Sequence, residues 1–191
     1  MKKIFCLFLV LTITVLSGCS ANKTDESTSL KSENDYFSVT YNGDFTYSYE
    51  IRDKSGNILL SDNSEKHEPH IDMLDENTVR LMIQRGTGIS AQNTVYIDIE
   101  TGIISENFIS VFDENNGRIA YHSYQNSKHY MIVRDIFDKG AFFKEFEIKD
   151  DIHVFEDAVV SADFSQDGKK ITVTYLAGEN YKETTTEFII E

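Results

Sequence analysis

Two histidines and an aspartate lie within six residues, in the stretch His67-Glu68-Pro69-His70 followed by Asp72. Imidazole nitrogens and carboxylate oxygens are ligands that Zn²⁺ takes in proteins, and a proline between the histidines could fix the turn that brings them onto one ion. The stretch is polar, and no second group of ligands follows it, so ordinary loop histidines are the alternative. His67, His70 and Asp72 are therefore candidate metal ligands, and a metal-dependent hydrolase is one hypothesis for the function.

The remaining residue types give no recognisable catalytic set. His122, His129 and His153 are separated in the sequence, and a role as general base would require the fold to bring them together. The segment 88–92 lacks the final glycine of a nucleophile elbow, and the glycine pair in 85–88 has neither the lysine nor the strand-to-helix context of a phosphate-binding loop. We predict no catalytic residue and no cofactor.

Two acidic turns, Asp113–Gly117 and Asp163–Gly168, contain oxygen ligands that suit Ca²⁺. Neither follows the twelve-residue loop that ends in a glutamate, so we interpret both as solvated turns.

The N-terminus has the pattern of an export signal. Lys2 and Lys3 precede a run of thirteen residues, from Ile4 to Leu16, that is apolar except for Thr12 and Thr14. This run is shorter than the roughly 20 residues that a membrane-spanning helix needs, and small residues follow it, which is typical of a signal peptide that is removed.

The end of the signal, Leu16-Ser17-Gly18-Cys19, resembles the lipobox of bacterial lipoproteins. The resemblance implies cleavage before Cys19 and transfer of diacylglycerol to its sulfur, and an ordinary signal peptide is the alternative. We expect a signal peptide over 1–18, a flexible polar tether over 19–35 and one domain over 36–191. The implied location is extracytoplasmic, with the chain anchored to the bacterial cell membrane through the lipid on Cys19.

The charge of the chain excludes some partners. The chain has 18 basic and 32 acidic residues, and without Lys2 and Lys3 the mature form has 16 and 32, a net charge of −16. Nucleic-acid binding needs clustered Lys and Arg, so we expect no nucleic-acid partner. The charge serves solubility or attracts cations or a basic partner.

Alternation of apolar and polar residues dominates the chain from Tyr36 onward. One set of alternating residues lies over 45–51, a second over 79–83, a third over 95–99 and a fourth over 171–175. This period of two is typical of half-buried strands, and no sustained helical period competes with it. The domain is predicted to be all-β.

The strands recur as units with a spacing near 40 residues. Polar turns with a glycine follow strands at Gly56, Gly102 and Gly140, where a hairpin needs a positive φ. The segment Ala162–Tyr175 resembles the blade start of WD-repeat-like and TolB-like β-propellers, and Val95–Gly102 is similar to their third strand and turn. The resemblance implies a short propeller-like array of about four antiparallel blades, with a β-sandwich or an open meander as alternatives.

Within this array, the units over 69–108 and 109–146 are complete, and the first and last units each lack one strand. Such a chain either closes as a small ring or leaves unpaired edges and faces.

These features together favour a non-enzymatic, lipid-anchored binding module outside the cytoplasm, with an unknown protein, peptide or saccharide ligand. Most of the ten Tyr and thirteen Phe residues are expected in the core, and a few exposed tyrosines on one face could stack on a sugar or hold a peptide. The alternatives are the metal-dependent hydrolase based on His67 and His70, and an assembly factor of the cell envelope.

Overall fold

The computed structural model describes residues 29–87, 91–150, 152 and 158–191, and its elements are fifteen β-strands. The all-β prediction is confirmed. Within the described part of the chain, no helix has the length and hydrophobicity that crossing a bilayer requires.

The strands form four antiparallel sheets in sequence order. Sheet A contains β1 (Ser29–Glu33), β2 (Phe37–Tyr41), β3 (Tyr47–Arg52) and β4 (Ile58–Glu65). Sheet B contains β5 (Pro69–Met73), β6 (Thr78–Gln84), β7 (Gln92–Asp98) and β8 (Phe108–Ile109). Sheet C contains β9 (Val111–Asn115), β10 (Arg118–Gln125), β11 (Lys128–Asp135) and β12 (Phe143–Ile148). Sheet D contains β13 (Val159–Phe164), β14 (Lys170–Ala177) and β15 (Lys182–Ile189). The prediction of about four antiparallel units is confirmed.

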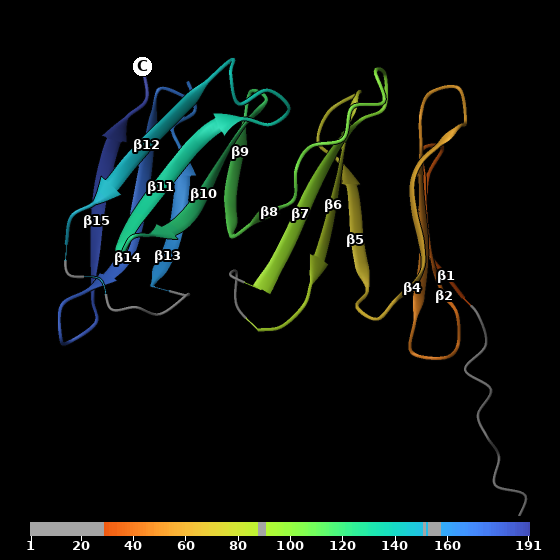
Figure 1. Ribbon diagram of the computed structural model, residues 1–191, viewed down its shortest axis with the longest axis horizontal. Helices are drawn as coiled ribbons and strands as arrows, with labels where there is room; N and C mark the ends of the chain where they lie inside the picture. The colour runs from red at the N-terminus through yellow and green to blue at the C-terminus, as the bar shows by residue number, and fades with distance from the viewer. Residues whose placement is uncertain (1–28, 88–90, 151, 153–157) are drawn as a thin grey trace, which may run out of the picture.

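The sheets stand face to face in a row, with sheet A at one end and sheet D at the other (Figure 1). Three clusters of buried side chains lie between them: one joins sheets A and B, one joins B and C, and one joins C and D. The arrangement in Figure 1 is an open stack, which was one of the alternatives that the strand count left open.

The strands run between two edges of the stack, called here its rims, where the turns lie. The rim with the C-terminus, called here the upper rim, carries the β3–β4, β5–β6 and β9–β10 turns (Figure 1). The opposite rim, called the lower rim, carries the start of β1, the β2–β3 turn and the β4–β5 connection. Each rim therefore presents its own set of turn residues to the surroundings.

Alternation in β6 shows how the sequence builds this stack. Val79, Leu81 and Ile83 are buried in the cluster between sheets A and B. Arg80 points to the opposite face of the sheet, where it meets residues of sheet C. A sheet in the middle of the row packs against a neighbouring sheet on each face. Polar residues on its second face, such as Arg80, therefore contact the next sheet.

Turn glycines follow the prediction at two of the three expected positions. Gly56 and Gly102 have φ values of 84° and 74°, which a residue without Cβ adopts at least cost. Gly140 is not in the positive-φ region, so that prediction is wrong. Its amide donates to Asp138 Oδ1 at 2.7 Å, and an added Cβ would lie 3.0 Å from the same oxygen, so close approach explains the glycine.

The folded domain begins earlier than the sequence indicated. Residues 29–33, which we placed in the polar tether, form β1 and pair with β2 in antiparallel register. The segment shows little apolar alternation because it is an edge strand, and backbone pairing to Phe37–Tyr41 orders it. The first unit therefore has four strands, and only sheet D has three.

Candidate functional site

The structure separates the predicted metal ligands. His67 lies in the β4–β5 connection, whereas His70 and Asp72 lie on β5 and point away from the buried Pro69 and Ile71. Asp72 accepts hydrogen bonds from Arg80, and no cluster of three or more His, Cys, Asp or Glu side chains in the described part of the chain is arranged to hold a metal. Asp72 therefore belongs to an ion-pair network. Cys19 and His153 lie outside the described residues.

Arg80 is the centre of that network, which joins sheets B and C. Its Nε and Nη2 donate to the two Asp72 oxygens at 3.0 and 2.6 Å. Its Nη1 lies 2.8 and 3.0 Å from the two oxygens of Glu114 on β9. Tyr96 on β7 is fully buried and donates its hydroxyl to Glu114 Oε1 at 2.7 Å. One guanidinium thus holds two carboxylates in place.

Protonation states in this network follow from burial and charge. Burial, strengthened by the nearby Glu114 carboxylate, raises the pKa of Tyr96, so its hydroxyl keeps its proton and remains a donor. Burial alone would lower the pKa of Arg80, but hydrogen bonds to Asp72 and Glu114 raise it overall. The network therefore carries one positive and two negative charges, a net charge of −1.

A second ion pair links the same two sheets, but here the arginine lies on sheet C and the carboxylate lies next to sheet B. Arg134 on β11 is buried and donates to Glu106, which precedes β8, and to the backbone oxygen of Asp135. Its guanidinium carbon also lies 5.2 Å from the centre of the Phe108 ring. The interface between sheets B and C is therefore held by two charged cross-links as well as by apolar packing.

A cavity of about 300 Å³ opens on the upper rim between sheets B and C. Leu74 and Ile136 supply apolar walls, and Asp75 and Glu114 supply carboxylate oxygens. Asp75 Oδ1 accepts from two backbone amides of its own turn, at 2.8 Å each, so this carboxylate is fixed. The Asn115 side chain turns away from the cavity: its buried Oδ1, which has no hydrogen-bond partner among the described residues, lies beside Gly168 in the β13–β14 turn of sheet D. The cavity therefore combines acceptor oxygens with apolar surface, which suits a ligand that donates hydrogen bonds.

Two of the scattered histidines meet between sheets C and D. His122 on β10 and His129 on β11 lie on one face, with His122 Nε2 3.0 Å from His129 Nδ1. The rings are nearly parallel, with centroids 5.2 Å apart, and the Tyr124 ring lies 4.7 Å from that of His129. His129 Nε2 is buried and lacks a partner within the described part of the chain. Burial lowers the pKa of His122 to about 4 and also lowers that of His129.

The acidic turns use their oxygens within the fold. Asp113 accepts from the backbone amide of Phe164 at 2.7 Å, which ties sheet C to sheet D. Asp167 accepts from the Ser165 hydroxyl at 2.7 Å and from the Lys169 amide at 3.2 Å. The Asp113 and Asp167 carboxylates therefore make hydrogen bonds that order the fold and its turns.

Sequence reasoning missed Arg80, Glu114 and Tyr96. The pairing of Arg80 with Asp72 had a signal, because the polar residues 75–77 precede the alternating stretch 79–83, and a hairpin around them places these two residues opposite each other. Glu114 and Tyr96 had none, since they meet Arg80 only through the packing of one sheet on the next.

Comparisons with known proteins give structural similarity only. No protein-family model and no curated protein matches the chain. The crystal structure of TolB from Acinetobacter baumannii is similar over 75% of this chain, with 14% identity and a TM-score of 0.41. The computationally designed proteins Ika4 and Ika8 are similar over 85% and 84% of it, with 14% and 15% identity and TM-scores of 0.38.

The chain covers different shares of these structures. It spans 35% of the TolB chain, 89% of the Ika4 chain and 45% of the Ika8 chain. At these identities no residue role carries over from TolB to this chain.

Proposed function

We propose that this protein is a lipid-anchored, extracytoplasmic binding module that recognises a basic segment of a peptide or protein at its upper rim. The observation that carries the proposal is the cavity between sheets B and C, where acceptor oxygens surround a small apolar surface. Lysine and arginine have an aliphatic stem and a donor head, so they match both parts of this lining. The strongly acidic composition draws the same ligands toward the domain.

The network behind the cavity supports this choice of ligand. Arg80, Asp72 and Glu114 together carry a charge of −1, and Asp75 adds another carboxylate at the mouth. Because Arg80 and Tyr96 fix Glu114, the carboxylate needs no rearrangement when a cation enters. A fixed acceptor loses less entropy on binding than a free side chain does.

Asp75→Asn is expected to weaken binding of a lysine-rich peptide on the order of tenfold, because it removes one charge-assisted contact. The asparagine oxygen can still accept from the Asn77 and Thr78 amides, so the turn is preserved. Isothermal titration with tetralysine and with tetraglutamate measures the effect.

The matched control is Asp163→Asn, which makes the same charge change at an exposed position of β13, away from the cavity. Equal loss of affinity in both variants would mean that tetralysine binds through overall charge alone and would refute the proposed cavity. No measurable binding of tetralysine would do the same.

The anchor is tested separately. Cys19→Ala is expected to move the protein from the membrane fraction into the medium or the precursor pool, because no sulfur remains to receive diacylglycerol. Cell fractionation with mass spectrometry of the mature N-terminus measures this outcome. Cys6→Ala, inside the expected signal peptide, should leave both location and mass unchanged. Full membrane retention of Cys19→Ala would contradict the anchor.

A further inference from the structure

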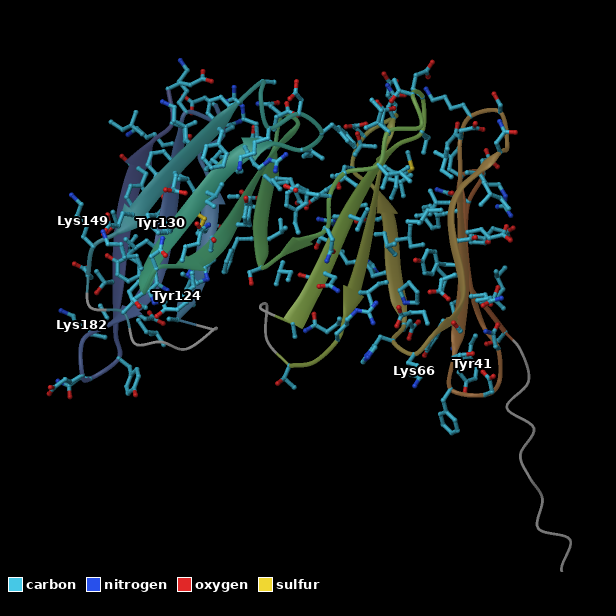
Figure 2. The ribbon with its side chains drawn as sticks, viewed as in Figure 1. Tyr41, Lys66, Tyr124, Tyr130, Lys149 and Lys182 are labelled. Carbon is cyan, nitrogen blue, oxygen red and sulfur yellow. The ribbon has the colours of Figure 1, made fainter. Side chains whose placement is uncertain are left out.

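An aromatic corner stands on the lower rim where the chain enters sheet A. It consists of Tyr41 at the end of β2, Phe45 in the β2–β3 turn, Tyr47 at the start of β3, Lys31 on β1 and Lys66 after β4. These five residues surround an open cavity of about 270 Å³, and Figure 2 shows Tyr41 and Lys66 together on this rim. This cavity lies at the surface, outside the buried core between sheets A and B.

Phe45 is the most exposed large apolar residue of the described chain, with 75% of its surface accessible. Its φ of 63° lies in the left-handed region, which L-residues with a side chain adopt at a cost. The Phe45 amide donates to the Tyr41 hydroxyl at 3.2 Å, so the turn holds the ring outward. A phenylalanine that the backbone holds in solvent adds little to the packing of the fold, so its ring is available for an external apolar contact.

The other residues of the aromatic corner form a polar border around this ring. The Tyr41 and Tyr47 rings lie 5.3 Å apart at 56°, and Lys31 Nζ lies 5.5 Å from the centre of the Tyr41 ring. Tyrosine and lysine place an apolar body next to a polar tip, and this combination is favoured at the boundary between lipid and water. The corner thus has an apolar tip inside a ring of amphipathic side chains.

The expected anchor lies close to this corner along the chain. Cys19 precedes Ser29, the first residue of β1, by ten positions, and Lys31 lies on β1 itself. Ten residues span at most about 35 Å even when fully extended. A lipid on Cys19 therefore keeps the lower rim of sheet A within reach of the bilayer surface.

We propose that the aromatic corner rests in the phospholipid head-group layer, with the Phe45 ring at the acyl boundary and Lys31 and Lys66 among the phosphates. This inference rests on the proposed lipid anchor. Asp44 and Glu68 lie at the same corner, where they accept from Thr46 and from the Tyr47 hydroxyl. Local charge is therefore nearly balanced, and the acyl chains rather than electrostatic attraction deliver the corner to the membrane. In this orientation the upper-rim cavity faces away from the bilayer.

The chain contains no tryptophan, so a single substitution creates a specific fluorescent reporter. Phe45→Trp places the reporter at the corner, and Ile103→Trp places a matched one in the β7–β8 loop on the opposite rim, where Ile103 is 51% exposed. The full acylated chain is reconstituted into vesicles of phosphatidylethanolamine and phosphatidylglycerol, with or without brominated acyl chains. We expect blue-shifted emission and strong quenching by bromolipid for Phe45→Trp only, and quenching by aqueous iodide for Ile103→Trp only.

A further substitution tests the lysines. Adding Lys31→Glu and Lys66→Glu to Phe45→Trp is expected to reduce bromolipid quenching, because two carboxylates then replace the cations that contact phosphate. Circular dichroism establishes that each variant keeps its β structure. Unchanged quenching in this triple variant would overturn the role given to the lysines.

The outcomes separate this inference from the anchor on which it rests. If mass spectrometry finds no diacylglycerol on Cys19, the anchor and the inference both fail. If the lipid is present but both reporters are equally open to iodide, only the orientation on the membrane is wrong. Blue-shifted emission at position 45 without bromolipid quenching would indicate a protein contact and would also overturn the inference.

Discussion

Arg80→Met is expected to lower the free energy of unfolding by about 3 kcal/mol, the lower end of the range for buried ion pairs, because this network is partly buried and two carboxylates lose their donor together. Methionine retains much of the arginine stem but leaves Asp72 and Glu114 without their donor at the interface between sheets B and C. Tyr96 alone cannot satisfy Glu114, because it donates a single proton. Urea unfolding followed by circular dichroism measures the loss.

Two further variants show whether the loss comes from unpaired carboxylates. Arg52→Met removes a more exposed arginine, 30% accessible against 20% for Arg80, which pairs with Glu50 on its own strand, and its effect should stay below about 1 kcal/mol. Glu114→Gln added to Arg80→Met should recover part of the stability, because the uncharged amide still accepts from Tyr96. If Arg80→Met behaves like Arg52→Met, the network does not join the two sheets energetically.

Sequence patterns predicted best those features that depend on residues close together in the chain. Alternation over 79–83 and 95–99 identified β6 and β7, which pair with each other in antiparallel register. A hairpin's register follows from its turn, so the opposition of Asp72 and Arg80 was also accessible. Assigning Asp72 to a metal overlooked the guanidinium that the same register places beside it.

Contacts between residues of different sheets could not be predicted from such patterns. Arg80 meets Glu114 across 34 positions, and Asp113 meets Phe164 across 51. Such contacts depend on how one sheet rotates onto the next, which no period in the sequence encodes. The cavity on the upper rim results from the same packing, so its lining could not be read from the spacing of its residues.

β1 shows a different limit of sequence patterns. Its residues, Ser-Leu-Lys-Ser-Glu, are mostly polar and resemble a linker in composition. An edge strand outside the main core needs few apolar residues, because its hydrogen bonds to β2 satisfy the backbone. Composition therefore misplaced the domain boundary and left the first unit one strand short.

The His122 and His129 pair is expected to make the domain lose stability as the pH falls from about 6.5 to about 4. In the unfolded chain a histidine takes up a proton near pH 6.5, whereas burial holds the pKa of folded His122 near 4. Between these values the unfolded state binds more protons, so acid favours unfolding. The interval corresponds to about 3 kcal/mol at 1.36 kcal/mol per pH unit. Urea unfolding at a series of pH values measures it.

The expected pH range is distinct from that of the carboxylates. Hydrogen bonds from turn amides and side chains lower the pKa of Asp53, Asp98 and Asp167, despite some opposing desolvation. Their contributions are present above their ordinary value near 3.8 and are lost only in stronger acid. A slope above about pH 5 therefore does not come from these carboxylates, and that is where the contribution of the histidine pair is measured.

His122→Gln isolates the pair, because a glutamine amide can still donate to His129 Nδ1 but does not titrate. The loss of stability between about pH 6.5 and 4 should shrink by more than half in this variant. His70→Gln, at an exposed position on β5, should keep the full loss. Since His129 Nε2 is buried without a partner, a proton placed on the pair has no acceptor among the described residues to stabilise it. The same slope in His122→Gln and in the unaltered protein would remove the pair as the source of acid sensitivity.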